Sequence, residues 1–152
     1  MKKEESIDYY IKSGWHSLSR LYNQKAQKHG ITTSTAFVLL NISSSEGTPA
    51  TKIAPLIGLE SRSLTRVLKN LEEKGFIYKE KDAFDRRSVR IFLTDMGKEK
   101  KGRAIETVKA FNQFVRERIP DDKLNTFIQV SSLIIDWTEN NEDLKQLINK
   151  EY

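Results

Sequence analysis

The sequence predicts a mainly α-helical fold with a small two-stranded β-wing. One apolar set recurs at the spacing of a helix: Leu64, Val67, Leu68 and Leu71. A second apolar set alternates farther along the chain, as in a strand with one buried face: Val89, Ile91 and Leu93. Gly75 lies between the two sets, where a glycine commonly ends a helix. A helix followed by a hairpin of this kind predicts a winged helix-turn-helix core.

Two helices are expected ahead of this core. Residues 6–29 carry apolar side chains three and four positions apart, which predicts a long amphipathic helix that stops at Gly30. Residues 32–45 continue with a second apolar face, and Thr33 or Ser34 is the expected N-cap.

A short third helix is expected over residues 49–57. Thr48 and Pro49 have the pattern of a cap residue followed by proline at the first helical position. Pro55 removes one backbone hydrogen bond within this helix, and we expect a kink there. Glu60 is a poor cap for the helix that follows, so we expect Ser61 to take that role.

The rest of the chain predicts two strands and further helices. The strand 76–81, the basic loop 82–88 and the returning strand complete the wing. A charged helix over 95–118 ends at Ile119-Pro120, and a second helix over 121–139 precedes a short one within 141–152.

Composition limits the classes of protein that the chain can belong to. Its 152 residues correspond to about one domain. The absence of cysteine excludes a disulfide scaffold, a cysteine-ligated zinc site and a thiol switch. No apolar run approaches the length of a membrane helix and no signal-peptide core is present, so we expect a cytoplasmic protein that does not contact a membrane. Two histidines leave little for a metal site, and we expect no metal or cofactor.

The positive charge is concentrated in the predicted core. Residues 60–103 carry 13 basic and 8 acidic side chains, whereas residues 104–152 carry 6 and 9. This asymmetry is typical of a nucleic-acid-binding face, although a solvated lysine-rich surface is the alternative.

The motifs in this region resemble those of the MarR family of transcriptional regulators. Residues 64–77 are similar to the recognition helix of that family and its exit into the wing. Asp85 and Arg87, followed after five residues by Leu93-Thr94, match the family's wing pattern D-x-R-x5-L-T. The resemblance implies a single chain, 1–152, with a winged-helix DNA-binding core at 32–94. It implies dimerisation helices at 6–29 and 95–152, and therefore a homodimer. Helices that fold back on their own core are the alternative.

Ten residues are candidates for DNA contact. The exposed side of the reading helix offers Ser61, Arg62, Ser63, Thr65, Arg66 and Lys69. Arg62 is the best candidate for a bidentate contact to guanine, whereas Arg66 and Lys69 are expected at phosphates. The alternatives are that Thr65 packs against its neighbours and that Lys69 is only solvated. The helix positions assigned to base contacts are defined to within about one residue, because the start of the reading helix is defined only that closely.

In the wing, the resemblance implies that Arg87 enters the minor groove and that Asp85 holds its guanidinium. The alternative for this pair is a turn-stabilising ion pair. Arg86 is expected at phosphate. Arg90 is expected either at phosphate or in an ion pair with an acidic neighbour.

The predicted function is that of a sequence-specific DNA-binding transcriptional regulator, expected to be a repressor, that binds a pseudo-palindromic operator as a homodimer. The resemblance also implies release by a small aromatic or amphipathic ligand. Candidate pocket residues are Trp15, His16, Tyr22 and Phe111, for which ordinary packing is the alternative. A winged-helix protein-interaction module is the competing function. No catalytic or cofactor motif is present, so an enzyme is not expected.

Overall fold

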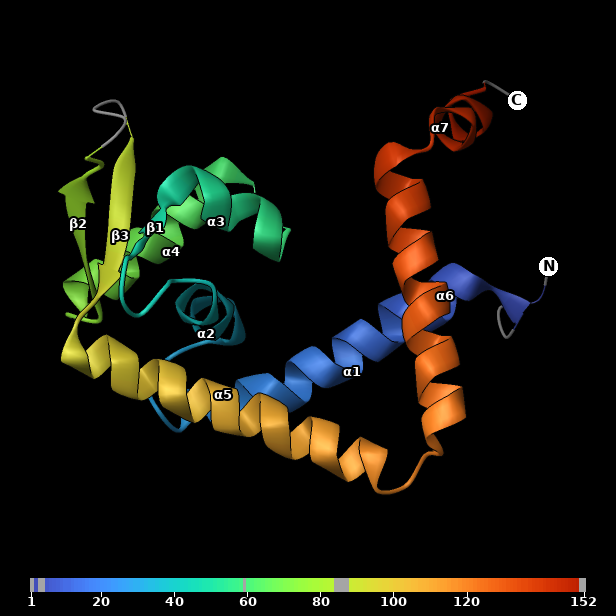
Figure 1. Ribbon diagram of the computed structural model, residues 1–152, viewed down its shortest axis with the longest axis horizontal. Helices are drawn as coiled ribbons and strands as arrows, with labels where there is room; N and C mark the ends of the chain where they lie inside the picture. The colour runs from blue at the N-terminus through green and yellow to red at the C-terminus, as the bar shows by residue number, and fades with distance from the viewer. Residues whose placement is uncertain (1, 3–4, 59, 84–87, 151–152) are drawn as a thin grey trace. The chain divides into compact units, whose positions relative to one another are not determined.

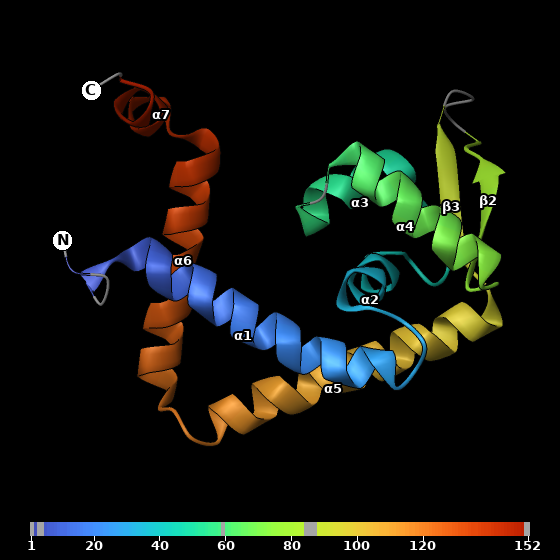
Figure 2. The ribbon, with the colours of Figure 1, turned by 180° about the vertical axis from the view of Figure 1, so that it is seen from behind.

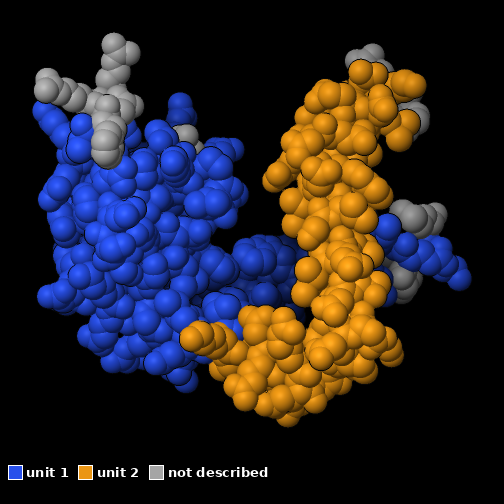
Figure 3. Space-filling model, viewed as in Figure 1, with its two compact units in different colours: residues 1–108 blue, residues 109–152 orange. Residues whose placement is uncertain are grey.

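The computed structural model describes residues 2, 5–58, 60–83 and 88–150. Its elements follow in the order α1 (Ile7–Gln27), α2 (Thr33–Leu40), β1 (Thr48–Pro49), α3 (Ala50–Ile57), α4 (Ser61–Glu73), β2 (Ile77–Lys81), β3 (Val89–Leu93), α5 (Asp95–Arg116), α6 (Asp121–Asn140) and α7 (Glu142–Ile148) (Figure 1). The chain forms two compact units, Met1–Val108 and Lys109–Tyr152 (Figure 3). The predicted fold class, mainly α with a small β-wing, is confirmed.

The wing is the outer part of a three-stranded antiparallel sheet with the order β1-β3-β2. Ile77 pairs with Leu93 at its base, and Lys81 pairs with Val89 near the loop. Figure 2 shows α4 running from α3 toward the base of this hairpin. The reading helix and the wing are therefore consecutive in the chain and adjacent in the fold.

The core of the first unit fixes which side of α4 faces outward. Its most deeply buried side chains come from α2, α3, α4, β3 and the segment after α2: Val38, Leu39, Ile42, Ile53, Leu71 and Ile91. Leu64 and Leu68 of α4 are also buried in this cluster, and Val67 packs against it. The predicted apolar face of the reading helix is confirmed.

The second helix is shorter than predicted, because α2 ends at Leu40. The side-chain amide of Asn41 donates to the Phe37 carbonyl over 2.9 Å. A side chain thus supplies a hydrogen bond to a carbonyl in the last turn of the helix. The expected caps were also wrong. Thr32 occupies the N-cap, and it forms a reciprocal capping box with Thr35.

Thr48 and Pro49 form a strand and not the predicted helix start. Thr48 pairs with Ile91, and Pro49 pairs with Arg90. Helix α3 therefore begins at Ala50, with Pro49 in the N-cap position. Glu60 is the N-cap of α4 and makes no side-chain capping bond, so Ser61 is the first helical residue and not the cap.

Helix α5 begins in close contact with the turn that precedes the wing. The Thr94 hydroxyl donates to the Gly75 carbonyl over 2.6 Å, and the Thr94 amide donates to the Phe76 carbonyl over 3.1 Å. A Cβ atom at Gly97 would lie 1.9 Å from the Phe76 carbonyl oxygen. The first turn of α5 thus lies against backbone that has no room for a side chain.

The second unit consists of the end of α5 together with α6 and α7. Helix α6 has no buried residue and carries exposed apolar side chains around much of its surface: Phe127, Ile128, Val130, Leu133, Ile135 and Trp137. In the described part of the chain, no helix is long and apolar enough to cross a membrane.

Candidate nucleic-acid interface

The exposed side of α4 carries a row of polar and basic residues. Arg62, Thr65, Arg66 and Lys69 are all exposed, and Ser63 is half-buried. They lie opposite the buried leucines of the same helix because the two sets are offset along the helical repeat. Ser61 is the first residue of α4. The row is thus presented to solvent by a helix whose other side is fixed in the core.

Two of these cations form no ion pair with an acid among the described residues. No carboxylate among the described residues forms an ion pair with Arg62 or Arg66, whereas Lys69 lies 3.9 Å from Glu73. Both of these partners are well exposed, so that pair is weak. The two guanidinium groups keep their donors available for an acceptor outside the chain.

The wing contributes a second set of basic side chains. Lys79 forms an ion pair with Glu72 of α4, which ties the hairpin to the reading helix. Lys81, two residues farther along β2 toward the loop, is exposed. The predicted contacts Asp85, Arg86 and Arg87 lie outside the described residues, so their roles remain predictions from sequence.

Arg90 has the second of its two predicted roles, the ion pair. Its Nε atom lies 2.9 Å from Oδ2 of Asp82, and its Nη1 donates to the Glu46 carbonyl over 3.0 Å. Asp82 is 5% exposed. The sequence alone does not single out Asp82, because its proximity to Arg90 depends on the register of the hairpin, in which Lys81 faces Val89.

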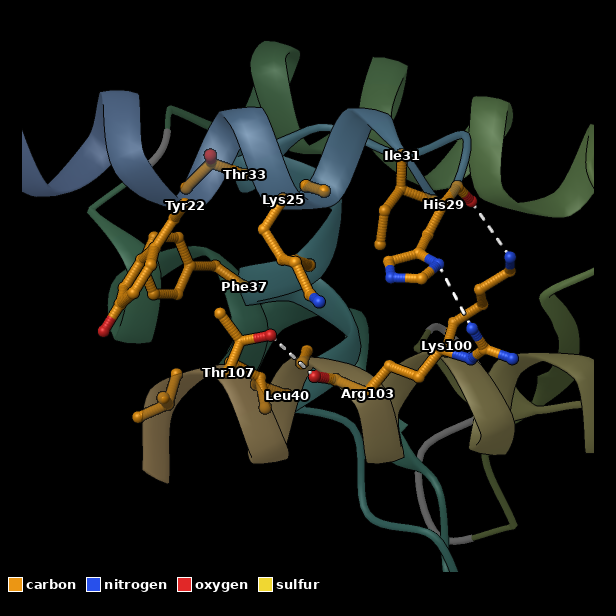
Figure 4. A pocket seen from close by; sticks show the side chains of 14 residues that line it. Tyr22, Lys25, His29, Ile31, Thr33, Phe37, Leu40, Lys100, Arg103 and Thr107 are labelled. Carbon is orange, nitrogen blue, oxygen red and sulfur yellow. Dashed lines mark hydrogen bonds between the residues drawn. The ribbon is translucent and has the colours of Figure 1, made fainter. Parts of the chain in front are cut away.

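An apolar pocket ringed by basic groups lies between α1, α2 and α5 (Figure 4). Tyr22, Phe37 and Leu40 supply apolar surface, while Lys25, His29, Lys100 and Arg103 supply nitrogen atoms. The Lys100 ammonium donates to the His29 carbonyl over 2.9 Å. Nη1 of Arg103 lies 3.2 Å from Nδ1 of His29, so the two basic side chains meet at the rim.

The electrostatics of this rim favour neutral His29. Partial burial lowers the pKa of His29 below its ordinary value, and the positive charges of Arg103, Lys25 and Lys100 lower it further. Glu99 acts in the opposite direction and is the weakest of these influences. A neutral imidazole can accept a hydrogen bond from Arg103 at Nδ1, in agreement with their short separation.

Three of the four residues predicted to line an effector pocket line two hollows of the first unit. Tyr22 lines the pocket just described. Trp15 and His16 line a separate groove between α1, α2 and α3 that reaches Gly58 at the turn before α4. Phe111 belongs to the second unit. Sequence reasoning missed His29, Lys25, Lys100 and Arg103, which come from helices far apart in the chain.

Comparisons with known proteins agree with this fold. Residues 31–89 match the MarR family. The HTH-type transcriptional regulator SarZ of Staphylococcus aureus (strain USA300) is 28% identical over 141 residues, which cover 91% of this chain and 94% of SarZ.

Solved structures share the architecture at lower sequence identity. The chain resembles the S. aureus MepR–DNA complex with a TM-score of 0.78 and 20% identity, over 86% of this chain and 97% of that one. It resembles the PcaV transcriptional regulator from Streptomyces coelicolor, in complex with its natural ligand, with a TM-score of 0.76 and 18% identity, over 90% of this chain and 96% of that one. These two likenesses concern the fold. The match over residues 31–89 and the relative of nearly equal length make the chain similar to members of the MarR family.

Proposed function

We propose that this protein is a sequence-specific DNA-binding transcriptional regulator. The observation that carries the proposal is the exposed row of α4, in which Arg62 and Arg66 form no ion pair with a described carboxylate. The DNA complex of MepR and the description of SarZ as a transcriptional regulator support the same function. The reading helix and the wing, within a DNA-binding core at residues 32–94, would contact one operator half-site.

Each basic group has a distinct role in this proposal. The N-terminal part of α4 enters the major groove, where Arg62 donates two hydrogen bonds to a guanine. Arg66 and Lys69 contact phosphates, which position the helix without reading sequence. Arg87 inserts into the minor groove, as the family wing pattern implies.

A homodimer would supply the second reading helix. The exposed apolar side chains of α6 and those of α1, such as Ile7, Tyr10 and Ile11, are the surfaces that we assign to the partner. Two-fold symmetry then places two reading helices about 34 Å apart, so the operator should be a pseudo-palindrome.

Replacement of Arg62 by alanine tests the reading role. We expect binding to the preferred operator to weaken by roughly 1–3 kcal/mol, with a much smaller loss on random DNA, because a base contact is removed. Fluorescence anisotropy at two salt concentrations measures both affinities. Lys12→Ala, which removes one charge from an exposed position on α1, should leave both nearly unchanged. Equal losses on both DNAs would make Arg62 a phosphate contact. Salt-insensitive binding, or none, by the unaltered protein would favour a protein-interaction module.

We further propose that the pocket between α1, α2 and α5 binds a small aromatic or amphipathic anion and that its binding releases DNA. The pocket is lined mainly by apolar side chains and is partly open to solvent. Apolar walls suit a ring, and the basic rim suits a carboxylate. Release requires that the ligand bind more tightly to a state in which the two reading helices do not match successive major grooves.

His29 makes this binding depend on pH. Because its pKa is lowered in the free protein, His29 is mainly neutral near pH 7. A bound carboxylate would favour the imidazolium and raise that pKa, so binding takes up a proton. Benzoate should therefore bind more tightly as the pH falls from about 7.5 to about 5.5. Titration calorimetry measures this dependence, and His29→Gln should flatten it. The same slope in both proteins would remove His29 from the site.

A further inference from the structure

The loop end of the wing contains a pair formed by a buried acid and an arginine, and this pair joins three segments of the chain. Asp82 follows β2, Arg90 lies on β3, and the carbonyls of Glu46 and Gly47 precede β1. Nε of Arg90 lies 2.9 Å from Oδ2 of Asp82, while Nη1 donates to Glu46 over 3.0 Å and to Gly47 over 3.5 Å. One guanidinium therefore fastens the wing to the loop that leads through β1 into α3.

The surrounding backbone leaves this connection little freedom. Gly47 has a positive φ of 65°, and a Cβ atom there would lie 2.7 Å from the Ile91 carbonyl oxygen. The Asp82 amide donates to the Ser88 carbonyl over 3.0 Å, which extends the strand pairing toward the loop. Since α3 and α4 follow β1 in the chain, the Arg90 contacts connect the hairpin to the segment that leads into the helix-turn-helix.

We propose that Asp82 and Arg90 are positioning residues that hold the wing in its DNA-binding orientation, and that Arg90 is not a phosphate contact. This inference rests on the proposed DNA-binding function. The Asp82 carboxylate is almost fully buried and cannot reach DNA in this fold. The Arg90 side chain is only 23% exposed, and its donors are directed at acceptors within the chain.

The pair requires a guanidinium and not merely a positive charge. Arg90 uses Nε for Asp82 and Nη1 for the two carbonyls, and these acceptors lie on different segments. A lysine ammonium is a single point of donation on a flexible stem and would not hold both sides at once. An Arg90→Lys variant therefore keeps the charge and loses the connection.

The two possible roles of Arg90 predict opposite results for a charge-conserving change. If Arg90 contacts phosphate, Arg90→Lys keeps most of the affinity and Asp82→Asn has little effect. If Arg90 positions the wing, each variant should weaken operator binding about tenfold. The double variant should then be no weaker than either single one, because both remove the same connection.

The test measures operator affinity by fluorescence anisotropy over a salt series, beside hydroxyl-radical footprints of the bound operator. We expect both variants to keep the salt slope of the unaltered protein, within about one counterion, and to lose protection at the flanks while the central protection by α4 remains. A merely structural role would lower the stability of the fold and would not remove flank protection selectively. Lys12→Ala, which removes an exposed charge from α1, is the control and should leave affinity, salt slope and footprint unchanged.

Wild-type affinity in Arg90→Lys or in Asp82→Asn, or intact flank protection in both, would overturn the positioning role alone. Absence of salt-sensitive operator binding by the unaltered protein would overturn the proposed function, and this inference with it.

Discussion

A Leu133→Asp variant is expected to be a monomer that has lost operator binding. Leu133 lies on α6 and is 50% exposed, next to other exposed apolar residues on the same helix. In the proposed homodimer this side chain is buried against the partner, where an unpaired carboxylate would be strongly unfavourable. A single subunit can hold only one half-site, so operator affinity should fall at least about a hundredfold.

Thr138→Asp provides the matched control for Leu133→Asp. Thr138 is an exposed polar residue on the same helix, five positions from Leu133 and so on nearly the opposite side, and its replacement changes the charge equally. This variant should remain dimeric and bind the operator nearly as the unaltered protein does. Sedimentation equilibrium and anisotropy measure the two properties. A Leu133→Asp protein that stays dimeric at micromolar concentration would mean that this part of α6 does not form the interface.

A Gly97→Ala variant is expected to lose about 3 kcal/mol of stability, at the upper end for overpacking. The added Cβ would lie 1.9 Å from the Phe76 carbonyl oxygen and 2.9 Å from its carbon. Both atoms belong to backbone that also accepts the Thr94 amide, so neither can move cheaply. Either α5 shifts away from the core or the turn before the wing distorts, and both outcomes break contacts.

Gly102→Ala on the same helix separates this clash from the effect of helix propensity. A Cβ atom at Gly102 would meet nothing within 4 Å, so alanine should stabilise α5 by roughly 0.5–1 kcal/mol. Urea unfolding at one fixed protein concentration compares the variants, because dimer stability depends on concentration. A Gly97→Ala protein as stable as Gly102→Ala would show that α5 does not pack against Phe76 in this way.

The sequence predicted the reading helix well because the information there is local. The spacing of Leu64, Leu68 and Leu71 places one side of α4 in the core, and the exposure of Arg62 and Arg66 follows from the same repeat. The returning wing strand, β3, was predictable for a similar reason, from the alternation of Val89, Ile91 and Leu93.

Features that depend on distant partners were not predictable from sequence. Thr48 and Pro49 have the pattern of a helix start, yet pairing with β3, about forty residues away, makes them a strand. The apolar pattern of α2 continues to Ile42, which is fully buried, although the helix itself ends at Leu40. Hydrophobic periodicity reports burial and does not by itself report where a helix stops.

The candidate sites show the same division. The exposed row of α4 came from periodicity, whereas the Asp82–Arg90 pair depends on hairpin register and the basic rim around His29 depends on the packing of α5 against α1. Neither arrangement has a signature within a short window of sequence. The contacts assigned to Asp85, Arg86 and Arg87 rest on the family wing pattern.

Selection of bound sequences from a random double-stranded DNA pool tests the central claim most directly. It measures DNA binding, symmetry and half-site spacing in one experiment. The proposed function predicts strong enrichment of an inverted repeat whose half-site centres lie about 10 base pairs apart, one turn of the duplex. Recovery of unenriched DNA, or of an isolated half-site with no symmetric companion, would contradict it.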